Sequence, residues 1–301
     1  MRLTRRTFFK LTGAAGATAV AATTAEASSG RTKEPQTPAV LVDTTRCVGC
    51  RACEAACAEA NALAQPYKSG DAAALDTRRS TDPTAFTVVN RFDGDAKHET
   101  RFVKKQCMHC LEPGCASACL VRAIEKTPEG PVVYHKDRCL GCRYCMVACP
   151  FDVPKYEYDK ALPYVTKCTF CQDRQAKGEP PACTSVCPTG ALTFGNRREL
   201  IDVARERLYE KGSTYVRHIY GENEVGGTSW MYITDIPIEK LGLPTDVGTY
   251  AYSSLTQASL AAVPFVLTLW PPLLMGIYSF SKRRNEVGVH GSDPREEADH
   301  V

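Results

Sequence analysis

The sequence predicts an α+β fold that carries one membrane-spanning helix near its C-terminal end. Three observations lead to this prediction. All 16 cysteines of the 301-residue chain fall into four groups of closely spaced positions. Short segments between the groups are typical of strand, turn and strand, and "AIEKTPEGPVVYH" at residues 123–135 is the clearest of them. Residues 259–280 form an uncharged, largely apolar run that is long enough to cross a bilayer.

Each cysteine group occupies one short stretch of chain. The groups are Cys47, Cys50, Cys53 and Cys57 (group one); Cys107, Cys110, Cys115 and Cys119 (group two); Cys139, Cys142, Cys145 and Cys149 (group three); and Cys168, Cys171, Cys183 and Cys187 (group four). Group three, in "CLGCRYCMVACP", has the spacing C-x2-C-x2-C-x3-C-P with which bacterial ferredoxins hold iron–sulfur clusters. At four thiolates per cubane, 16 cysteines suffice for four 4Fe-4S clusters, and we expect all of them to be iron ligands.

Two other uses of clustered cysteines compete with iron–sulfur clusters. A disulfide framework is typical of small secreted domains without a core, whereas this chain is long and 44% hydrophobic. Zinc is the closer alternative, because paired C-x2-C hooks are ordinary zinc ligands. Zinc sites typically draw two cysteines from each hook, however, while groups one and three offer three cysteines at i, i+3 and i+6 and a fourth beyond. The spacing therefore favours iron–sulfur clusters.

Groups two and three enclose the strand–turn–strand segment, as in a two-cluster ferredoxin whose halves exchange their last cysteine ligands. We expect groups one and four to form a second such unit around the first. The predicted fold is two nested ferredoxin-like units in one domain, at about residues 40–200, with an insertion at 58–106. The predicted ligand sets are Cys47, Cys50, Cys53 and Cys187 (set A); Cys57, Cys168, Cys171 and Cys183 (set B); Cys107, Cys110, Cys115 and Cys149 (set C); and Cys119, Cys139, Cys142 and Cys145 (set D).

Other residues of the cysteine loops give weaker signals. Gly49 and Gly141 precede the second cysteine of groups one and three, where a residue without Cβ lets the backbone approach a cluster, although turns alone also favour glycine. His109 lies between two cysteines, and we expect it to be a packing or surface residue because its group already has four thiols. Positive residues near the loops would raise cluster potentials or simply be solvated; they are Lys104, Lys105, Arg138, Arg143 and Lys167.

Residues 1–27 have the features of an export signal rather than of a basic amphipathic helix. "TRRTFFK" at residues 4–10 is a twin-arginine signature, an apolar stretch follows, and "AEA" at residues 25–27 supplies a small-x-small cleavage motif. Clusters are assembled in the cytosol, so the protein has to be exported already folded, which the twin-arginine route permits. Removal of this segment takes the formal charge from +3 to zero, which leaves no basic excess to favour nucleic acid.

The run "SLAAVPFVLTLWPPLLMGIYSF" at residues 259–280 predicts a single transmembrane helix, with a buried core helix as the alternative. Prolines 264, 271 and 272 would kink this helix or require a neighbouring helix to satisfy its backbone. The basic triplet Lys282-Arg283-Arg284 follows directly and predicts a cytoplasmic tail at residues 281–301. The cluster domain would then face the periplasm.

The chain has no pattern typical of a catalytic site. No Ser/His/Asp arrangement, dinucleotide fingerprint or nickel or molybdenum site stands out, and Gly226-Gly227 is not followed by the Lys-Ser/Thr of a phosphate loop. Residues 201–258 are expected to be an extension for docking a partner, and "RRELIDVARERLYEKG" at 197–212 predicts a helix that ends at Gly212. We therefore expect an electron-transfer subunit without its own catalytic centre. A zinc-structural or nucleic-acid-binding protein is the alternative from another class.

The chain resembles the four-cluster ferredoxin-like subunits of bacterial membrane-bound oxidoreductases over residues 40–245. "KKQCMHC", "GCRYCMVACP" and "VPKYEY" are most similar to the HybA-type subunit of hydrogenase-2, and "ACTSVCPTGALTFG" and "EVGGTSWMY" are also similar to the formate dehydrogenase beta subunit. Leu120 and Ala58 depart from the family pattern, because a proline often follows the last cysteine of groups two and one. Proline is not a ligand, so the expected cluster number is unchanged.

The resemblance implies an electron relay between a catalytic subunit and a quinone-reactive membrane subunit. It favours a periplasmic nickel–iron hydrogenase as the catalytic partner. A formate dehydrogenase, or another molybdopterin oxidoreductase, is the alternative partner.

Overall fold

The computed structural model describes residues 37–64, 72–94 and 99–290. Internal contacts divide the chain into two units, residues 1–36 and residues 37–301. The predicted export signal at residues 1–27 lies outside the described residues, as does the end of the predicted tail, residues 291–301.

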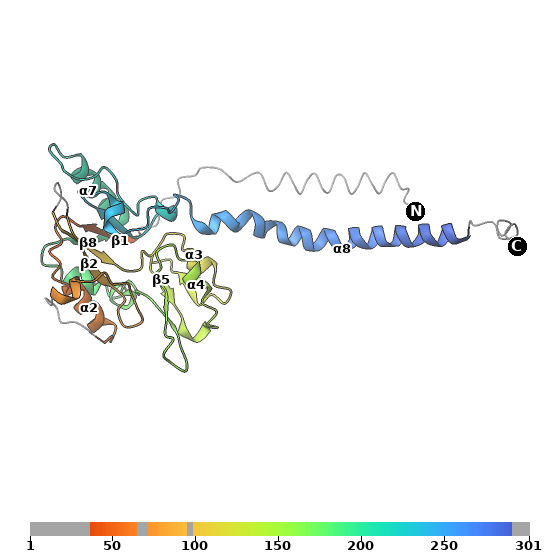
Figure 1. The fold of residues 1–301 in the computed structure, drawn as a ribbon, viewed down its shortest axis with the longest axis horizontal. Helices are drawn as coiled ribbons and strands as arrows, with labels where there is room; N and C mark the ends of the chain where they lie inside the picture. The colour runs from red at the N-terminus through yellow and green to blue at the C-terminus, as the bar shows by residue number, and fades with distance from the viewer. Residues whose placement is uncertain (1–36, 65–71, 95–98, 291–301) are drawn as a thin grey trace. The chain divides into compact units, whose positions relative to one another are not determined.

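A three-stranded sheet lies between the cysteine-bearing loops and helix α7 (Arg197–Tyr209). Its strands are β8 (Leu192–Asn196), β1 (Pro38–Asp43) and β9 (Trp230–Ile233), with β1 in the centre, antiparallel to β8 and parallel to β9. Successive side chains of β1 point to opposite faces of the sheet. Leu41 packs with helix α7 on one face, while Val40 and Val42 pack with cysteine-bearing loops on the other. Figure 1 shows α7 and the cysteine-bearing helix α2 (Ala52–Ala60) on opposite sides of β1 and β8.

Helix α7 confirms the helix predicted at residues 197–212, although it ends at Tyr209, before Gly212. The side chain of Asn196 caps its first turn by accepting a hydrogen bond from the backbone N–H of Arg198 at 3.0 Å. Leu200, Ala204 and Leu208 recur at helical spacing and are buried against the sheet. This apolar stripe fixes α7 on the sheet face opposite the cysteines.

Short elements surround the cysteine groups, and the structure pairs their helices across the sequence. Helix α2 (Ala52–Ala60) of group one packs on α6 (Ala182–Ser185) of group four, and α3 (Gly114–Ser117) of group two packs on α4 (Tyr144–Val147) of group three. The remaining short helices are α5 (Gln172–Gln175) and the 3-10 turns η1 (Ala72–Leu75), η2 (Lys136–Arg138), η3 (Glu224–Gly226) and η4 (Ile238–Leu241). Groups far apart in sequence are therefore neighbours in space.

Three two-stranded hairpins complete the described strands: β2 (Val88–Phe92) with β3 (Arg101–Lys105), β4 (Ile124–Lys126) with β5 (Val132–Tyr134), and β6 (Lys155–Tyr156) with β7 (Val165–Thr166). The β4–β5 hairpin confirms the strand–turn–strand prediction at residues 123–135. Strand β2 lies within the insertion at 58–106, in the segment "AFTVVNRF", whose β-branched and aromatic residues are typical of a strand. Its partner β3 was missed because residues 101–105 are mostly charged.

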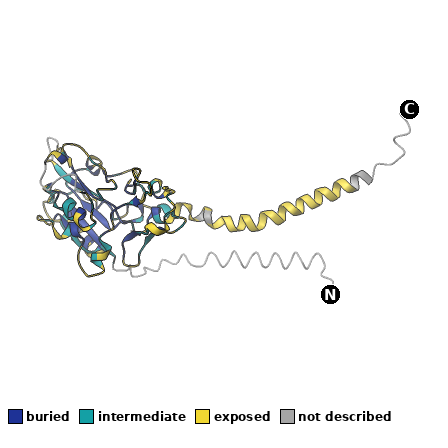
Figure 2. Ribbon diagram, turned by 90° about the horizontal axis from the view of Figure 1, so that it is seen from below, coloured by how far each residue is buried: buried dark blue, intermediate teal, exposed yellow. Residues whose placement is uncertain are grey.

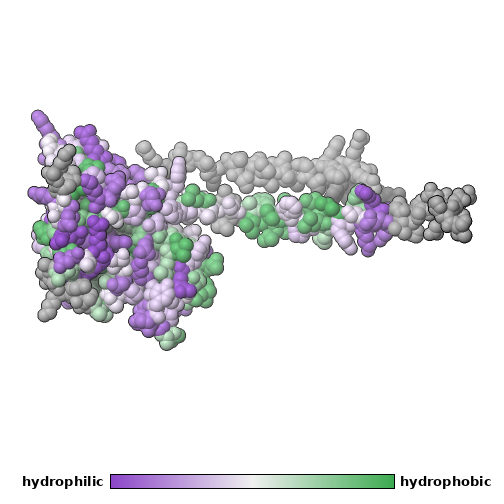
Figure 3. Space-filling view, viewed as in Figure 1, coloured by the Kyte–Doolittle hydropathy of each residue, from purple (hydrophilic) through white to green (hydrophobic). Residues whose placement is uncertain are grey.

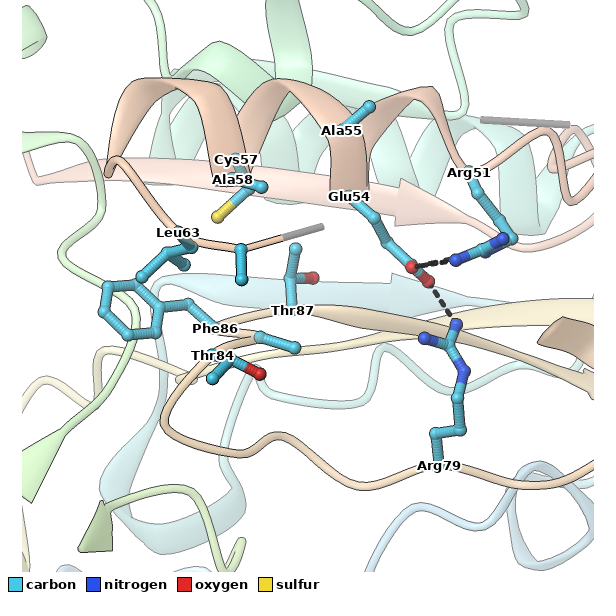
Figure 4. A pocket seen from close by; sticks show the side chains of 12 residues that line it. Arg51, Glu54, Ala55, Cys57, Ala58, Leu63, Arg79, Thr84, Phe86 and Thr87 are labelled. Atoms are coloured by element: carbon cyan, nitrogen blue, oxygen red, sulfur yellow. Dashed lines mark hydrogen bonds and ion pairs between the residues drawn. The ribbon is translucent and has the colours of Figure 1, made fainter. Parts of the chain in front are cut away.

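A carboxylate of α2 ties the insertion to the cysteine helix (Figure 4). Glu54 lies between two cysteines of group one, and its Oε2 accepts a hydrogen bond from Arg51 Nη2 at 2.7 Å. Its Oε1 accepts another from Arg79 Nη2 at 2.6 Å and also pairs with the backbone N–H of Val89 on β2. The three charged side chains are mostly buried, so each needs the others to offset lost hydration. Glu54 therefore holds β2 against α2.

Helix α8 (Tyr252–His290) contains the predicted apolar run but is longer at both ends than residues 259–280. Residues 252–286 are long and apolar enough to cross a membrane, with a mean hydropathy of 1.9 over the most apolar window. The described side chains beyond its first turn are exposed (Figure 2), and the apolar stretch gives way to a polar end at the basic residues (Figure 3). The helix continues past the basic triplet and ends at His290.

The first turn of α8 contacts the cysteine region. Tyr252 packs against the main core cluster, and Ser253 Oγ donates a hydrogen bond to Glu112 beside α3 at 3.4 Å. Pro271 and Pro272 inside the helix lack the N–H groups that would pair with the carbonyls of Leu267 and Thr268. The apolar helix thus starts next to groups two and three.

Candidate iron–sulfur centres

The four C-x2-C loops share one backbone feature. The residue before the second cysteine has a left-handed conformation in every loop, with φ of 70° at Gly49, 46° at His109, 69° at Gly141 and 57° at Phe170. Glycine adopts this conformation without strain, and a Cβ at Gly49 would lie 2.6 Å from the ring of Phe102. Sequence reasoning found the two glycines but missed that His109 and Phe170 occupy the same position.

Backbone amides in these loops point at cysteine sulfurs. The N–H groups of Gly141 and Phe170 donate to the thiols of Cys139 and Cys168, each at 3.4 Å. Ala123 N–H donates to Cys119 at 3.1 Å. Hydrogen bonds of this kind stabilise negative charge on sulfur.

Two cavities are each lined by four cysteines. The first cavity, partly open to solvent, has at its walls all four thiols of set A: Cys47, Cys50, Cys53 and Cys187. The second cavity has all four thiols of set B: Cys57, Cys168, Cys171 and Cys183. The rest of the first wall is mainly apolar, with Val42, Val48 and Leu192. Each cavity therefore offers four sulfur donors and Lys104 in its wall, and a set of soft thiolate donors suits an iron–sulfur cluster.

The cysteines of sets C and D are also neighbours. Burial raises the pKa of Cys110, and the nearby thiolates of Cys107, Cys149 and Cys115 raise it further, so the last cysteine of group three lies with group two. Burial, followed by the thiolates of Cys139, Cys119 and Cys142, raises the pKa of Cys145 to about 11. The last cysteine of group two thus lies with group three. The cysteines that the spacing assigned to set C are therefore neighbours, and so are those of set D, while their exchange as cluster ligands stays a prediction.

The thiol groups lie too far apart to hold one ion. Among the described residues no three His, Cys, Asp or Glu side chains converge closely enough to hold a single metal ion. In a cubane each thiolate binds a different iron atom, so four thiols spread around a cavity are the donor set such a group requires. Burial raises the pKa of Cys57 and Cys115 to about 12, which disfavours the free thiolates, whereas binding to a metal favours them.

His109 is fully buried, which confirms that it packs inside the protein. Its Nδ1 accepts a hydrogen bond from the backbone N–H of Val132 at 2.9 Å, so the ring proton is on Nε2. Burial lowers the pKa of His109 well below its usual value, and the charges of Lys167 and Lys126 lower it further, which keeps the ring neutral. Nε2 is buried and makes no hydrogen bond to the described residues, which leaves a donor between cysteine loops.

The five positive residues singled out in the sequence divide into two kinds. Lys104 and Lys167 are buried, with exposures of 2% and 5%, whereas Lys105 is half-buried and Arg138 and Arg143 are exposed. Sequence reasoning missed Lys126, whose Nζ donates to the carbonyl of His109 at 3.3 Å. Its position on β4, two residues beyond a buried isoleucine, was the available signal. Buried and half-buried cations therefore lie close to the cysteine loops, and the exposed Arg138 and Arg143 are adjacent in sequence to cysteines of set D.

Four C-x2-C loops that present their thiols in sets of four define an iron–sulfur protein of the ferredoxin-like class. Residues 98–197 match a family described as a 4Fe-4S dicluster domain. A protein of Nitratidesulfovibrio vulgaris is 46% identical over 291 residues, which cover 95% of this chain and 79% of the relative.

Two further relatives carry informative names. The hydrogenase-2 operon protein HybA of Escherichia coli O157:H7 is 37% identical over 295 residues, covering 86% of this chain and 89% of the relative. The nitrate-inducible formate dehydrogenase iron–sulfur subunit of Escherichia coli K12 is 34% identical over 241 residues, covering 76% and 81%. The chain belongs to the family of iron–sulfur electron-transfer subunits that includes these two proteins.

Proposed function

We propose that this chain relays electrons through four 4Fe-4S clusters between a catalytic subunit and a quinone-reactive membrane subunit. Sets A, B, C and D would each hold one cluster, and the observation that carries this proposal is that two separate cavities are each lined by one complete set. A cluster held by four thiolates exchanges single electrons and has no open position for a substrate. The chain would therefore conduct electrons without a catalytic site of its own.

The neighbour relations of the cysteines support one row of sites in the order A, B, C, D. Lys104 lies in the wall of both the set A and the set B cavity. Cys168 of set B interacts electrostatically with Cys107 of set C, and Cys115 of set C with Cys145 of set D. Sets A and D would then be the two ends of the relay, as expected for two nested ferredoxin-like units.

Substitution of Cys149 tests the assignment of ligands across groups. Cys149→Ser should damage the cluster bound by Cys107, Cys110 and Cys115 and spare the one bound by its sequence neighbours in group three. The electron paramagnetic resonance (EPR) spectra of the variant show which of these two clusters is lost. Loss of the set D signal with set C intact would contradict the exchange of ligands.

The set D end has the features of a docking surface for the membrane subunit. Cys142 of this set is exposed. Four large apolar side chains beside it are also exposed: Leu120 by 91%, Leu140 by 74%, Tyr144 by 56% and Val147 by 81%. Exposed apolar patches of this kind mark interaction sites. Because the first turn of α8 contacts α3 of the same region, a partner in the membrane is the occupant we propose.

The location we propose is the periplasmic side of the inner membrane. Twin-arginine export, removal of residues 1–27 and a single-pass anchor at 259–280 would leave the cluster domain outside and the tail at 281–301 in the cytoplasm. The length and hydropathy of α8 support the anchor, and a neighbouring helix could satisfy the carbonyls at its prolines. Residues 201–258 would help to dock the catalytic partner.

A nickel–iron hydrogenase is the catalytic partner we propose, since the HybA relative aligns over more of the chain than the formate dehydrogenase subunits. Deletion of this chain should leave hydrogenase activity with an artificial dye intact and abolish hydrogen-dependent quinone reduction. If hydrogen-to-quinone electron flow survives while formate-to-quinone flow fails, the partner is a formate dehydrogenase instead.

A further inference from the structure

Lys104 lies between the two cysteine-lined cavities. It is a residue of β3 and lines the first cavity together with the thiols of set A and the second cavity together with the thiols of set B. Its side chain is 2% exposed. One buried ammonium group therefore faces two sites that would each carry a strongly anionic group.

The surroundings of Lys104 hold it in place without neutralising it. Its Nζ donates a hydrogen bond to Gln106 Oε1 at 3.0 Å and lies 4.4 Å from the centre of the Trp230 ring. Gln106 Nε2 donates to the hydroxyl of Tyr232 at 2.8 Å, and that hydroxyl donates to the carbonyl of Lys104 at 2.8 Å. This closed network orients the amide oxygen of Gln106 toward the ammonium group.

No carboxylate balances this charge. Within the described residues, Lys104 makes no ion pair, and its ammonium group contacts a neutral amide and an aromatic ring. A buried ammonium ion is costly unless an anion accompanies it. In the part of the chain that the structure describes, the side chains that share the two cavity walls with Lys104 and can carry negative charge are the cysteines of sets A and B.

We infer that Lys104 is the shared counter-cation of the groups held by sets A and B and that it raises both of their reduction potentials. This inference rests on the proposed function. Reduction adds one negative charge to a cluster, so a fixed positive charge next to it stabilises the reduced state more than the oxidised state. Because Lys104 lines both cavities, its effect extends to two neighbouring steps of the relay.

The clusters of sets C and D serve as internal controls, because we expect their reduction potentials not to depend on Lys104. Set C has other cations close to it: the half-buried Lys126 interacts with Cys110 and Cys107, and the buried Lys167 lowers the pKa of Cys115 against the larger effect of burial. Neither set includes a cysteine that lines a cavity with Lys104. Removal of the Lys104 charge should therefore act on two of the four potentials.

The test is a redox titration of the full-length chain, followed by EPR spectroscopy. Lys104→Met keeps the apolar stem over Trp230 and removes the charge. This substitution should lower the equilibrium constant for reduction of two of the four clusters at least tenfold. That change corresponds to a reduction potential lower by about 59 mV for a one-electron couple. Lys104→Arg should keep both potentials close to the original values. Lys105→Met, a half-buried neighbour on the same strand, is the matched control and should shift none of them.

The outcome also separates this inference from the function on which it rests. Unchanged potentials in a Lys104→Met protein with full iron content would overturn the role of Lys104, as would equal shifts of all four couples. If Lys104→Met does not assemble its clusters, Lys104→Gln, which keeps a donor for Gln106, carries the same expectation. Original protein that contains zinc or no iron would overturn the proposed function instead.

Discussion

The imidazole ring of His109 stacks on the phenyl ring of Phe170, with centroids 4.7 Å apart and planes inclined by 24°. Both residues hold left-handed conformations, in the loops that carry cysteines of set C and of set B. A side chain in this conformation costs about 1–2 kcal/mol. The contact between the two rings, and that of Phe170 with Trp230 at 5.9 Å, stabilises these loops and offsets the strain.

Removal of the Phe170 ring should therefore weaken the packing contact between the two cysteine loops. Phe170→Ala should destabilise the protein by about 3–5 kcal/mol, because a fully buried aromatic side chain leaves a cavity. The urea concentration at which cluster absorbance is half lost measures this change. Tyr158→Ala, at a ring 68% exposed, is the control and should have little effect. An unchanged midpoint for Phe170→Ala would show that the stack does not hold the loops.

The carboxylate of Glu54 should be needed to hold the insertion against α2. Glu54→Ala removes the partner of two largely buried guanidinium groups and should cost about 3 kcal/mol of stability. Limited proteolysis should then cleave within residues 72–94 faster than in the original protein. Glu59→Ala changes an exposed carboxylate of the same helix and should leave both stability and cleavage unaltered.

The apolar surface at set D should bind the membrane subunit. Leu140→Glu and Val147→Glu place charge on exposed positions, so both variants should fold and keep their iron content. They should lose at least tenfold in affinity for the membrane partner, measured by copurification from solubilised membranes. Tyr209→Glu at the exposed end of α7, across the sheet from the cysteines, is the control. Full binding by both set D variants would place the docking surface elsewhere.

Export should depend on the paired arginines. Changing Arg5 and Arg6 to Lys should leave the cluster-loaded protein in the cytoplasm, because the twin-arginine route requires this pair. Cell fractionation with an antibody to the cluster domain measures how the protein is distributed between cytoplasm and periplasm. The orientation of the anchor is tested separately, because a reporter fused after Arg284 should be active only if it is a reporter that works in the cytoplasm. Normal export of the Lys variant would refute the twin-arginine assignment.

Local patterns predicted much of this molecule. The Pro/Gly turn between apolar residues predicted the β4–β5 hairpin, and the periodic stripe of Leu200, Ala204 and Leu208 predicted α7. Ferredoxin spacing predicted which cysteines lie near one another. Their role as iron ligands stays a prediction.

Contacts between residues far apart in the sequence could not be predicted from local patterns. Nothing local to Lys104 reveals that it lines two cavities, because their walls come from four separate parts of the chain. His109 and Phe170 carry side chains that give no sign of a left-handed backbone, unlike Gly49 and Gly141. The charged strand β3 forms because it pairs with β2 and covers the cysteine core, and that context overrides its weak strand propensity.

Metal and sulfide analysis tests the central claim most directly. Anaerobically purified full-length protein should contain about 16 iron and 16 acid-labile sulfide per chain, which corresponds to four cubanes on the 16 cysteines. Iron and sulfide near half of this amount would mean that only two of the four cysteine sets hold clusters. Zinc in place of iron, with no sulfide, would contradict the account as a whole.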